Sequence, residues 1–171
     1  MRFFSKEITT DKIAESLVGF FDADYDSLVT ADIFKDQQIS INKEQNKELI
    51  VVPMFAIIRA VIATFGDTLK TKHILGKFQY DILNKHFKDA EERSQFSELF
   101  SKRCDEYSEI LNPENKDLAI QFGQIFCTHF FDKEEDGSHL VVMLLVGMMF
   151  AEQMIAGKKF LDEVSSHYEI I

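Results

Sequence analysis

Three aspartates, Asp22, Asp24 and Asp26, follow an apolar segment at alternate positions, and their spacing is the clearest suggestion of chemistry in the chain. Alternate side chains in a tight loop turn toward one point, and hard cations such as Ca²⁺ prefer carboxylate oxygens. We therefore predict a carboxylate-rich turn at 22–26. The favoured interpretation is a solvated acidic helix cap, which needs no ligand, and the alternative is weak binding of a divalent cation by these three residues.

The segment from 21 to 33 resembles the first half of an EF-hand calcium loop. It departs from that loop where affinity is decided, because Ser27 replaces the turn glycine and Ile33 replaces the chelating glutamate. A second segment, 132–138, has the glycine but places Met143 at the glutamate position. The resemblance implies weak calcium binding at most, and we expect no other cofactor.

Arg59 and Glu152 are each the only charge in a long apolar segment, 49–65 and 140–156 respectively. A buried charge without a partner costs several kcal/mol, so each must reach water, a ligand or the other residue. One hypothesis is that the two side chains meet, directly or across a small polar pocket that could bind a ligand. The alternative is that each lies where its helix reaches the surface, with Arg59 extending past its apolar stem.

Motifs for other chemistry are absent from the sequence. The five histidines lack the Glu-x-x-His and His-Glu-x-x-His spacings of metal-binding helices, and the seven glycines are isolated rather than grouped into a phosphate-binding loop. Cys104 and Cys127 have no neighbouring ligand set and are expected to be free thiols. We therefore expect no catalytic activity.

The net charge of −10, from 29 acidic and 19 basic residues, disfavours phosphate backbones and anionic lipid surfaces as partners. The N-terminus lacks the apolar region and cleavage site of a secretory signal. The segment 140–156 is shorter than the roughly 20 apolar residues that span a bilayer. We therefore expect a cytoplasmic protein that binds no nucleic acid, with 140–156 as a buried core helix rather than a membrane span.

A composition of 46% apolar residues, with 17 Phe, 7 Gly and only 2 Pro, is too hydrophobic for disorder and too poor in turn formers for a many-stranded sheet. The predicted fold is all-α, a single domain over 1–171. We expect a bundle of six to eight helices around a buried apolar helix at about 140–156 and a Pro-interrupted helix at about 43–65.

Local signals predict several helix ends. Asn42 and Gln45 match a capping box, and Gly66 can end the same helix in a left-handed conformation. Pro53 is expected to kink or interrupt it, since proline removes one backbone hydrogen bond. Gly157 is expected to separate the apolar helix from a final amphipathic piece.

These features favour a helical interaction or adaptor module that forms a homodimer or binds another protein, because its apolar helices need further burial. The alternative function is binding of an apolar or acidic small molecule in a cavity beside the helix at 140–156. Weak cation binding at 22–26 is the third possibility.

Overall fold

The computed structural model describes residues 6–111, 116–134 and 137–171. These residues form six long helices, one five-residue helix and two three-residue strands. In chain order the elements are β1 (Lys6–Ile8), α1 (Thr10–Val29), α2 (Asp32–Asp36), α3 (Lys43–Phe65), α4 (Leu69–His86), α5 (Ala90–Ile110), α6 (Leu118–Phe130), α7 (Leu140–His167) and β2 (Tyr168–Ile170). The predicted all-α bundle is confirmed.

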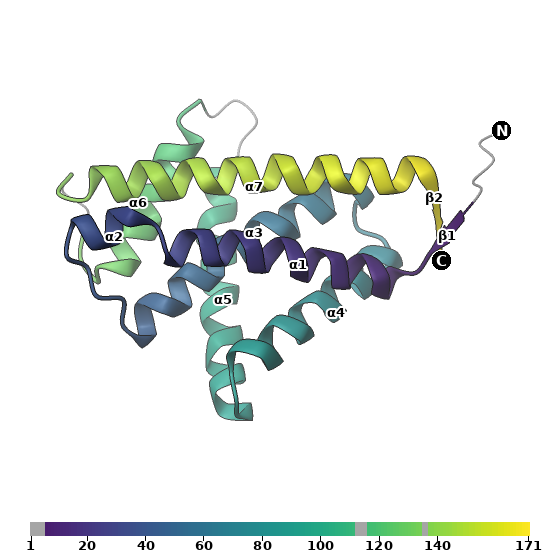
Figure 1. Cartoon of the computed structure of the whole chain (residues 1–171), viewed down its shortest axis with the longest axis horizontal. Coiled ribbons are helices and arrows are strands. Elements are labelled where there is room, and N and C mark those ends of the chain that lie inside the picture. Colours follow the sequence, from purple (N-terminus) through teal and green to yellow (C-terminus); the bar gives the residue numbers. More distant parts are fainter. Residues whose placement is uncertain (1–5, 112–115, 135–136) are drawn as a thin grey trace.

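Helices α3 and α7 form the centre of the bundle, and their mutual contact is the most extensive in the described structure. Helix α7 lies along one long side of the molecule with α1 beside it, while α4 and α5 meet at a short turn and diverge from it (Figure 1). Helix α6 packs against α7, and α1 packs against both α3 and α4. The two apolar segments of the sequence are therefore neighbours, as the predicted architecture requires.

Stacked aromatic rings fill the centre where α3, α5, α6 and α7 converge. The ring centroids of Phe122 and Phe150 lie 3.9 Å apart with nearly parallel planes, and those of Tyr107 and Phe122 lie 4.2 Å apart. Phe55 on α3 lies 5.7 Å from Phe150. All four side chains are almost completely buried, so this stack ties four helices to one apolar centre.

The helix caps follow the local sequence closely. The Asn42 side chain accepts hydrogen bonds from the backbone N–H groups of Glu44 and Gln45, and the Gln45 side chain accepts one from the Asn42 N–H. Gly66 ends α3 with φ of 63°, a conformation that other residues adopt rarely. Both predicted ends of α3 are confirmed.

Pro53 does not interrupt α3, which is one helix from Lys43 to Phe65. The proline lacks the N–H that would have donated a backbone hydrogen bond to the carbonyl of Leu49, and its ring crowds that carbonyl. Every residue from Glu48 to Ile58 is buried, and this packing outweighs the loss of one bond. The expected interruption of the helix is therefore wrong.

Gly157 does not end α7, which continues to His167. A Cβ at Gly157 would lie 3.1 Å from the Cβ of Ala60, so the glycine marks a close approach of α7 to α3. Leu161 and Val164, beyond the glycine, are buried and extend the contact face of the helix. The expected break was inferred from glycine's low helix propensity, which tertiary packing overrides here.

Strands β1 and β2 pair in parallel at one end of the bundle and bring the two ends of the described chain together (Figure 1). The N–H of Thr10 donates to the carbonyl of Ile171 over 3.1 Å, which joins the start of α1 to the residue after β2. This strand pair was not expected from the sequence, because three-residue strands carry too little periodicity to be recognised.

Candidate functional site

Asp22, Asp24 and Asp26 lie inside α1 rather than in a turn, so the predicted loop geometry is wrong. Alternate residues of a helix are about 200° apart around its axis, and their side chains therefore diverge. Asp22 instead forms an ion pair with Lys85 of α4, with 2.6 Å between Oδ1 and Nζ. Burial raises the pKa of Asp24, whose carboxyl is partly enclosed.

Among the described residues, no group of three or more His, Cys, Asp or Glu side chains is placed to hold a metal ion. The second EF-hand-like segment, 132–138, includes residues 135 and 136, which lie outside the described residues. The aspartates at 22–26 do not converge on one point, and the geometry therefore gives no support to a calcium site there.

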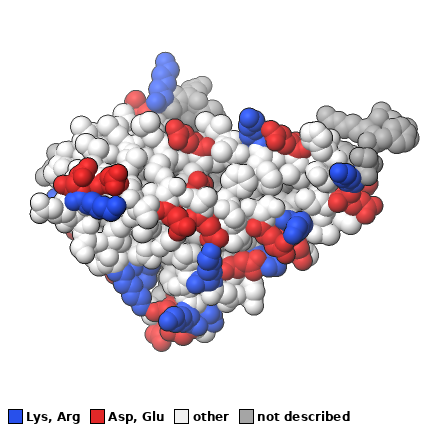
Figure 2. All heavy atoms as spheres, in the orientation of Figure 1, with Lys and Arg blue, Asp and Glu red and all other residues white. Residues whose placement is uncertain are grey.

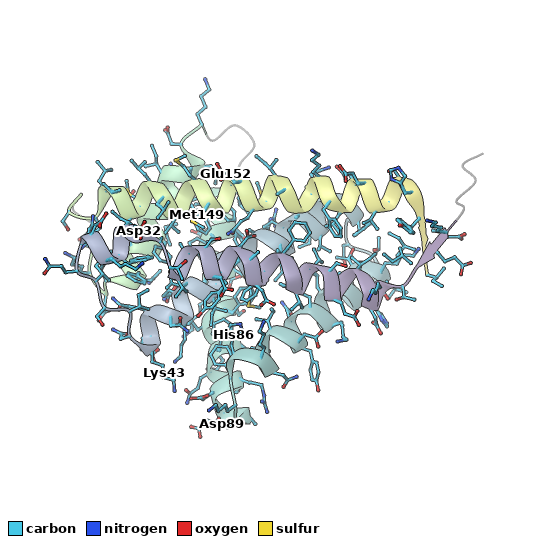
Figure 3. The ribbon with its side chains drawn as sticks, viewed as in Figure 1. Asp32, Lys43, His86, Asp89, Met149 and Glu152 are labelled. Atoms are coloured by element: carbon cyan, nitrogen blue, oxygen red, sulfur yellow. The ribbon has the colours of Figure 1, made fainter. Side chains whose placement is uncertain are left out.

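Arg59 and Glu152 form no ion pair with each other, so the direct pairing that we considered is wrong. Glu152 is exposed near the middle of α7, one turn after Met149 (Figure 3). Arg59 is half-buried on α3, and no hydrogen bond or ion pair joins it to another described residue. Burial raises the pKa of the Cys104 thiol on α5 to about 12, and the negative charge of Asp105 acts in the same direction. The charge of Arg59 has a smaller, opposite effect on this pKa.

The buried charges of the structure lie elsewhere, in a network that joins α3, α5 and α6. The Arg103 guanidinium donates to both carboxylate oxygens of Glu48, with N–O distances of 2.7, 3.0 and 3.1 Å. It also approaches Glu106 at 3.4 Å, and Glu106 Oε2 lies 2.5 Å from Nε2 of His129. The chain of contacts is thus Glu48, Arg103, Glu106 and His129.

The Glu48–Arg103 ion pair is buried and stabilises the contact between α3 and α5. Their side chains are only 7% and 11% exposed, so each charge depends on the other for compensation. Burial alone would lower the pKa of Arg103, but the hydrogen bonds and charge of Glu48 outweigh it and raise the pKa. The guanidinium is already occupied by carboxylates, and the network therefore offers no free cation to a ligand.

The network lines a cleft of about 710 Å³ at the N-terminal end of α3. Arg103 and His129 contribute to its wall together with Lys43, which forms an ion pair with Glu92 of α5. Figure 3 shows Lys43 and Asp89 at the same end of the molecule, where α3 and α5 begin. Acidic and basic groups alternate here, which favours internal pairing over recognition of an ion of one sign.

The second unusual feature is an exposed apolar face on α7. The side chains of Val141, Met148 and Ile155 are 55%, 56% and 66% exposed, and Leu144 between them is 37% exposed. The opposite face of the helix carries buried residues such as Val146 and Phe150. The prediction of a core helix is therefore right for one face and wrong for the other.

The exposed apolar face of α7 sets it apart from α3, the other long apolar helix. Helices α3 and α7 are both long and apolar enough to cross a membrane by length and composition alone. In α3, 72% of the most apolar window is buried inside the protein, against 39% for α7. The unusual apolarity of α3 is explained by the core, whereas that of α7 is explained only in part.

Charged side chains of both signs are interspersed over the face shown in Figure 2, without a large field of one sign. The overall surplus of acid therefore does not gather into one patch on this face. The charge distribution on this face therefore gives no support to long-range electrostatic attraction of a strongly charged partner.

The network of Glu48, Arg103, Glu106 and His129 was not predicted from the sequence. Successive members of this network are 55, 3 and 23 residues apart along the chain, so most of its contacts leave no local signal. Only the spacing of Arg103 and Glu106, three residues apart on one helix, was a local signal. The two cysteines form no disulfide, as predicted, and Cys104 is half-buried while Cys127 is buried.

No protein-family model, curated protein or solved structure matches this chain. Its function must therefore be inferred from its own geometry.

Proposed function

We propose that the protein is a non-enzymatic interaction module that forms a homodimer through the exposed apolar face of α7. The observation that supports this proposal is the stripe formed by Val141, Leu144, Met148 and Ile155, hereafter the α7 stripe. Its members are spaced by three, four and seven residues, so they follow one side of the helix. Exposed apolar surfaces that continue over several turns are typical of interfaces.

The spacing of the α7 stripe suits a second copy of the same helix. Residues that recur at alternating steps of three and four form the seam along which two helices pack side by side. From Val141 to Ile155 the seam is about 21 Å long. In an antiparallel pair with its two-fold axis at Met148, Val141 of one copy faces Ile155 of the other.

The charge pattern supports the same arrangement. Residues 140–150 carry no charge, so two copies of this part of α7 can approach without like-charge repulsion. Glu152 lies at the edge of the stripe and can remain in water.

The neighbouring surface can enlarge the contact. A stable interface buries about 800 Å² on each partner, more than one narrow stripe supplies. Leu140 is 49% exposed beside the stripe, and Ile120 at the start of α6 is 43% exposed. Helix α6 borders α7 closely, since a Cβ at Gly147 would lie 1.8 Å from the carbonyl oxygen of Ala119. Ile120 follows Ala119 directly, so α6 offers a further exposed apolar residue close to α7.

Sedimentation equilibrium at micromolar concentration tests the proposal. The expected mass is twice the 19.8 kDa of one chain. Met148→Glu places a charge at the two-fold axis and is expected to yield monomers. Tyr80→Glu is the matched control, because Tyr80 is 65% exposed on α4, and it should leave the dimer intact.

A wild-type monomer at tens of micromolar would contradict the proposal, as would a Met148→Glu variant that keeps the dimer mass. Flotation with zwitterionic phosphatidylcholine vesicles examines the competing use of the same face. Wild-type protein that is monomeric in solution but floats with vesicles, and loses this property in Met148→Glu, would assign the stripe to a membrane surface instead.

A further inference from the structure

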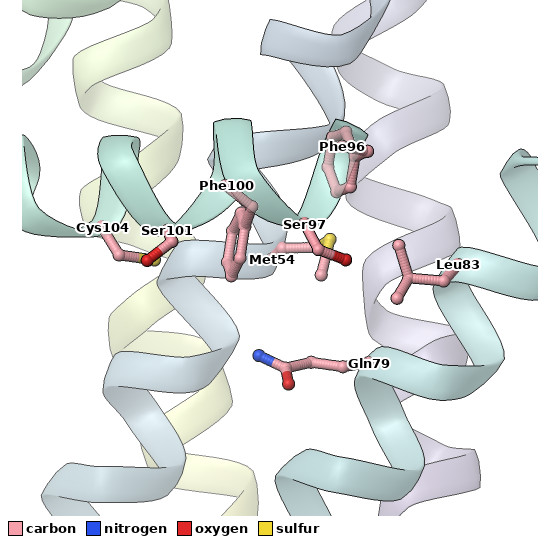
Figure 4. A pocket seen from close by; sticks show the side chains of 8 residues that line it. All are labelled: Met54, Gln79, Leu83, Phe96, Ser97, Phe100, Ser101 and Cys104. Atoms are coloured by element: carbon pink, nitrogen blue, oxygen red, sulfur yellow. The ribbon is translucent and has the colours of Figure 1, made fainter. Parts of the chain in front are cut away.

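A second, separate hollow lies between α4 and α5, with α3 as its floor (Figure 4). Both helices pack on α3, whereas their contact with each other is slight, because they diverge from the turn that joins them. The hollow has a volume of about 290 Å³ and is lined by Met54, Gln79, Leu83, Phe96, Ser97, Phe100, Ser101 and Cys104. The cavity expected from the sequence was placed beside α7, whereas this hollow is formed by other helices.

Most of the lining is apolar. Phe96 is fully buried and stacks with Phe100, with 6.0 Å between the ring centroids, and the Phe100 ring extends from α5 toward α3 (Figure 4). Leu83 is half-buried and Phe100 is 7% exposed, so both present apolar surface to an occupant. Such a lining suits an aromatic ring or a short hydrocarbon.

No charged side chain lines the hollow, since none of its eight lining residues is acidic, basic or a histidine. Burial raises the pKa of Cys104 to about 12, so this thiol is neutral at physiological pH. Asp105 and Arg59 act on the thiol with opposite signs, and neither residue lines the hollow. An ion that entered would lose hydration without gaining a counter-charge from the lining. The hollow therefore favours a neutral ligand.

Gln79 supplies a polar group inside this apolar lining. Its side chain is half-buried and extends from α4 into the hollow, toward α3 (Figure 4). The Gln79 amide forms no hydrogen bond with any residue in the described parts of the chain, whereas the Ser97 hydroxyl donates to the Arg93 carbonyl over 2.8 Å. A glutamine amide offers two N–H donors and one carbonyl acceptor, so it matches a ligand that also carries a donor and an acceptor.

We propose that the hollow between α4 and α5 binds a small neutral amide, with its apolar body on Leu83 and Phe100 and its amide group on Gln79. With about 30 Å³ for each water-sized group, the hollow accommodates roughly ten non-hydrogen atoms. Phenylacetamide has this size and serves as the probe. The site is independent of the α7 stripe and of the proposed dimer.

Isothermal titration of the full chain with phenylacetamide and with phenylacetate tests the proposal. The two probes have nearly the same shape and differ in charge, so the ratio of their affinities reports the preference for a neutral ligand. We expect phenylacetamide to bind with a Kd on the order of 0.1–1 mM, and phenylacetate at least about tenfold more weakly. Equal affinities, or no heat with phenylacetamide at several millimolar, would overturn the proposal.

A glutamine substitution tests the polar contact. Gln79→Leu should weaken phenylacetamide binding about fivefold, the loss expected when neutral hydrogen bonds are removed. Gln95→Leu makes the same change at an exposed position of α5 outside the lining, and it should leave the affinity unchanged. Equal affinities of Gln79→Leu and the wild type would overturn the assignment of Gln79 as the group that binds the amide.

Blocking variants locate the site. Ser101 is exposed at the rim of the hollow, so Ser101→Trp should occupy it without disturbing the core and abolish phenylacetamide binding. Ser108→Trp, on an exposed position of the same helix outside the lining, should leave binding unchanged. Met148→Glu, in the α7 stripe, should also retain phenylacetamide binding. Unchanged binding in Ser101→Trp would overturn the location of the site.

Discussion

Glu48→Gln should be among the most destabilising single changes on the polar side chains of this protein. The substitution keeps the shape of the side chain and removes its charge, which leaves the Arg103 guanidinium without its principal partner. Three N–O contacts of 2.7 to 3.1 Å join the two side chains, and only 7% and 11% of their surfaces are exposed. The effect is therefore that of breaking a buried ion pair.

The magnitude follows from that geometry. Removing one partner of a buried pair costs about 3–5 kcal/mol, because the remaining charge is left buried. A glutamine oxygen in the position of Oε1 can still accept two of the three hydrogen bonds, and Glu106 lies 3.4 Å from Arg103, so part of the compensation remains. We expect a loss of about 2–4 kcal/mol in the free energy of unfolding. For a chain of this size, that corresponds to a fall in Tm of about 5–15 °C.

Urea denaturation followed by far-ultraviolet circular dichroism measures this loss. Glu15→Gln is the matched control, since Glu15 pairs with Lys12 on the surface of α1 and their side chains are 54% and 69% exposed. It should change the stability by no more than about 0.5 kcal/mol. The double variant Glu48→Leu/Arg103→Met should recover most of the loss, because neither charge is then left alone.

A loss below about 1 kcal/mol in Glu48→Gln, indistinguishable from Glu15→Gln, would refute the assignment of the pair as buried. If the double variant is instead as unstable as Glu48→Gln, the Glu48–Arg103 pair contributes more to the free energy of unfolding than the compensation of one charge by the other. Either result would contradict the interpretation that charge compensation between Glu48 and Arg103 holds α3 and α5 together.

Two further predictions concern close packing and pH. Gly147→Ala should destabilise the protein by about 2 kcal/mol or more, because the new Cβ would lie 1.8 Å from the Ala119 carbonyl oxygen. Gly19→Ala, in open space within α1, should stabilise it by about 0.5–1 kcal/mol, and equal effects in thermal unfolding would contradict the close contact of α6 with α7. Burial lowers the pKa of His86 below its usual 6.5, so its NMR titration should have a midpoint below that value. Because the unfolded chain then binds the proton more readily than the folded chain, the His86 contribution to stability should fall as pH drops below about 6.5. An NMR titration midpoint at or above 6.5 would contradict the burial of the imidazole.

Local signals in the sequence were sufficient where the deciding atoms are close together along the chain. The capping box of Asn42 and Gln45 involves atoms within three residues, and Gly66 ends α3 through its own backbone conformation. The amphipathic spacing of the helices likewise predicted the fold class, since it reflects which side of each helix must be buried. These features could be predicted because no distant residue decides them.

The 22–26 segment shows why other features could not be predicted. Its aspartates suggested a turn, but Lys85 pairs with Asp22 from 63 residues away, and Phe21 and Tyr25 pack against the ring of His86. These contacts with α4 favour continuation of α1 over the local tendency of aspartate to form turns. Only the tertiary structure brings the two segments together.

The same distinction applies to the candidate sites. The sequence alone determined that 140–156 is too apolar to be left fully in water. Which side of α7 is covered depends on where α3 and α6 pack, and this leaves Val141, Met148 and Ile155 exposed. The charge of Arg59 was evident from the sequence, but only packing decides that it is half-buried on α3 without an ion pair to the described residues. Composition determines how much apolar surface must be buried, and only packing decides which surface remains for a partner.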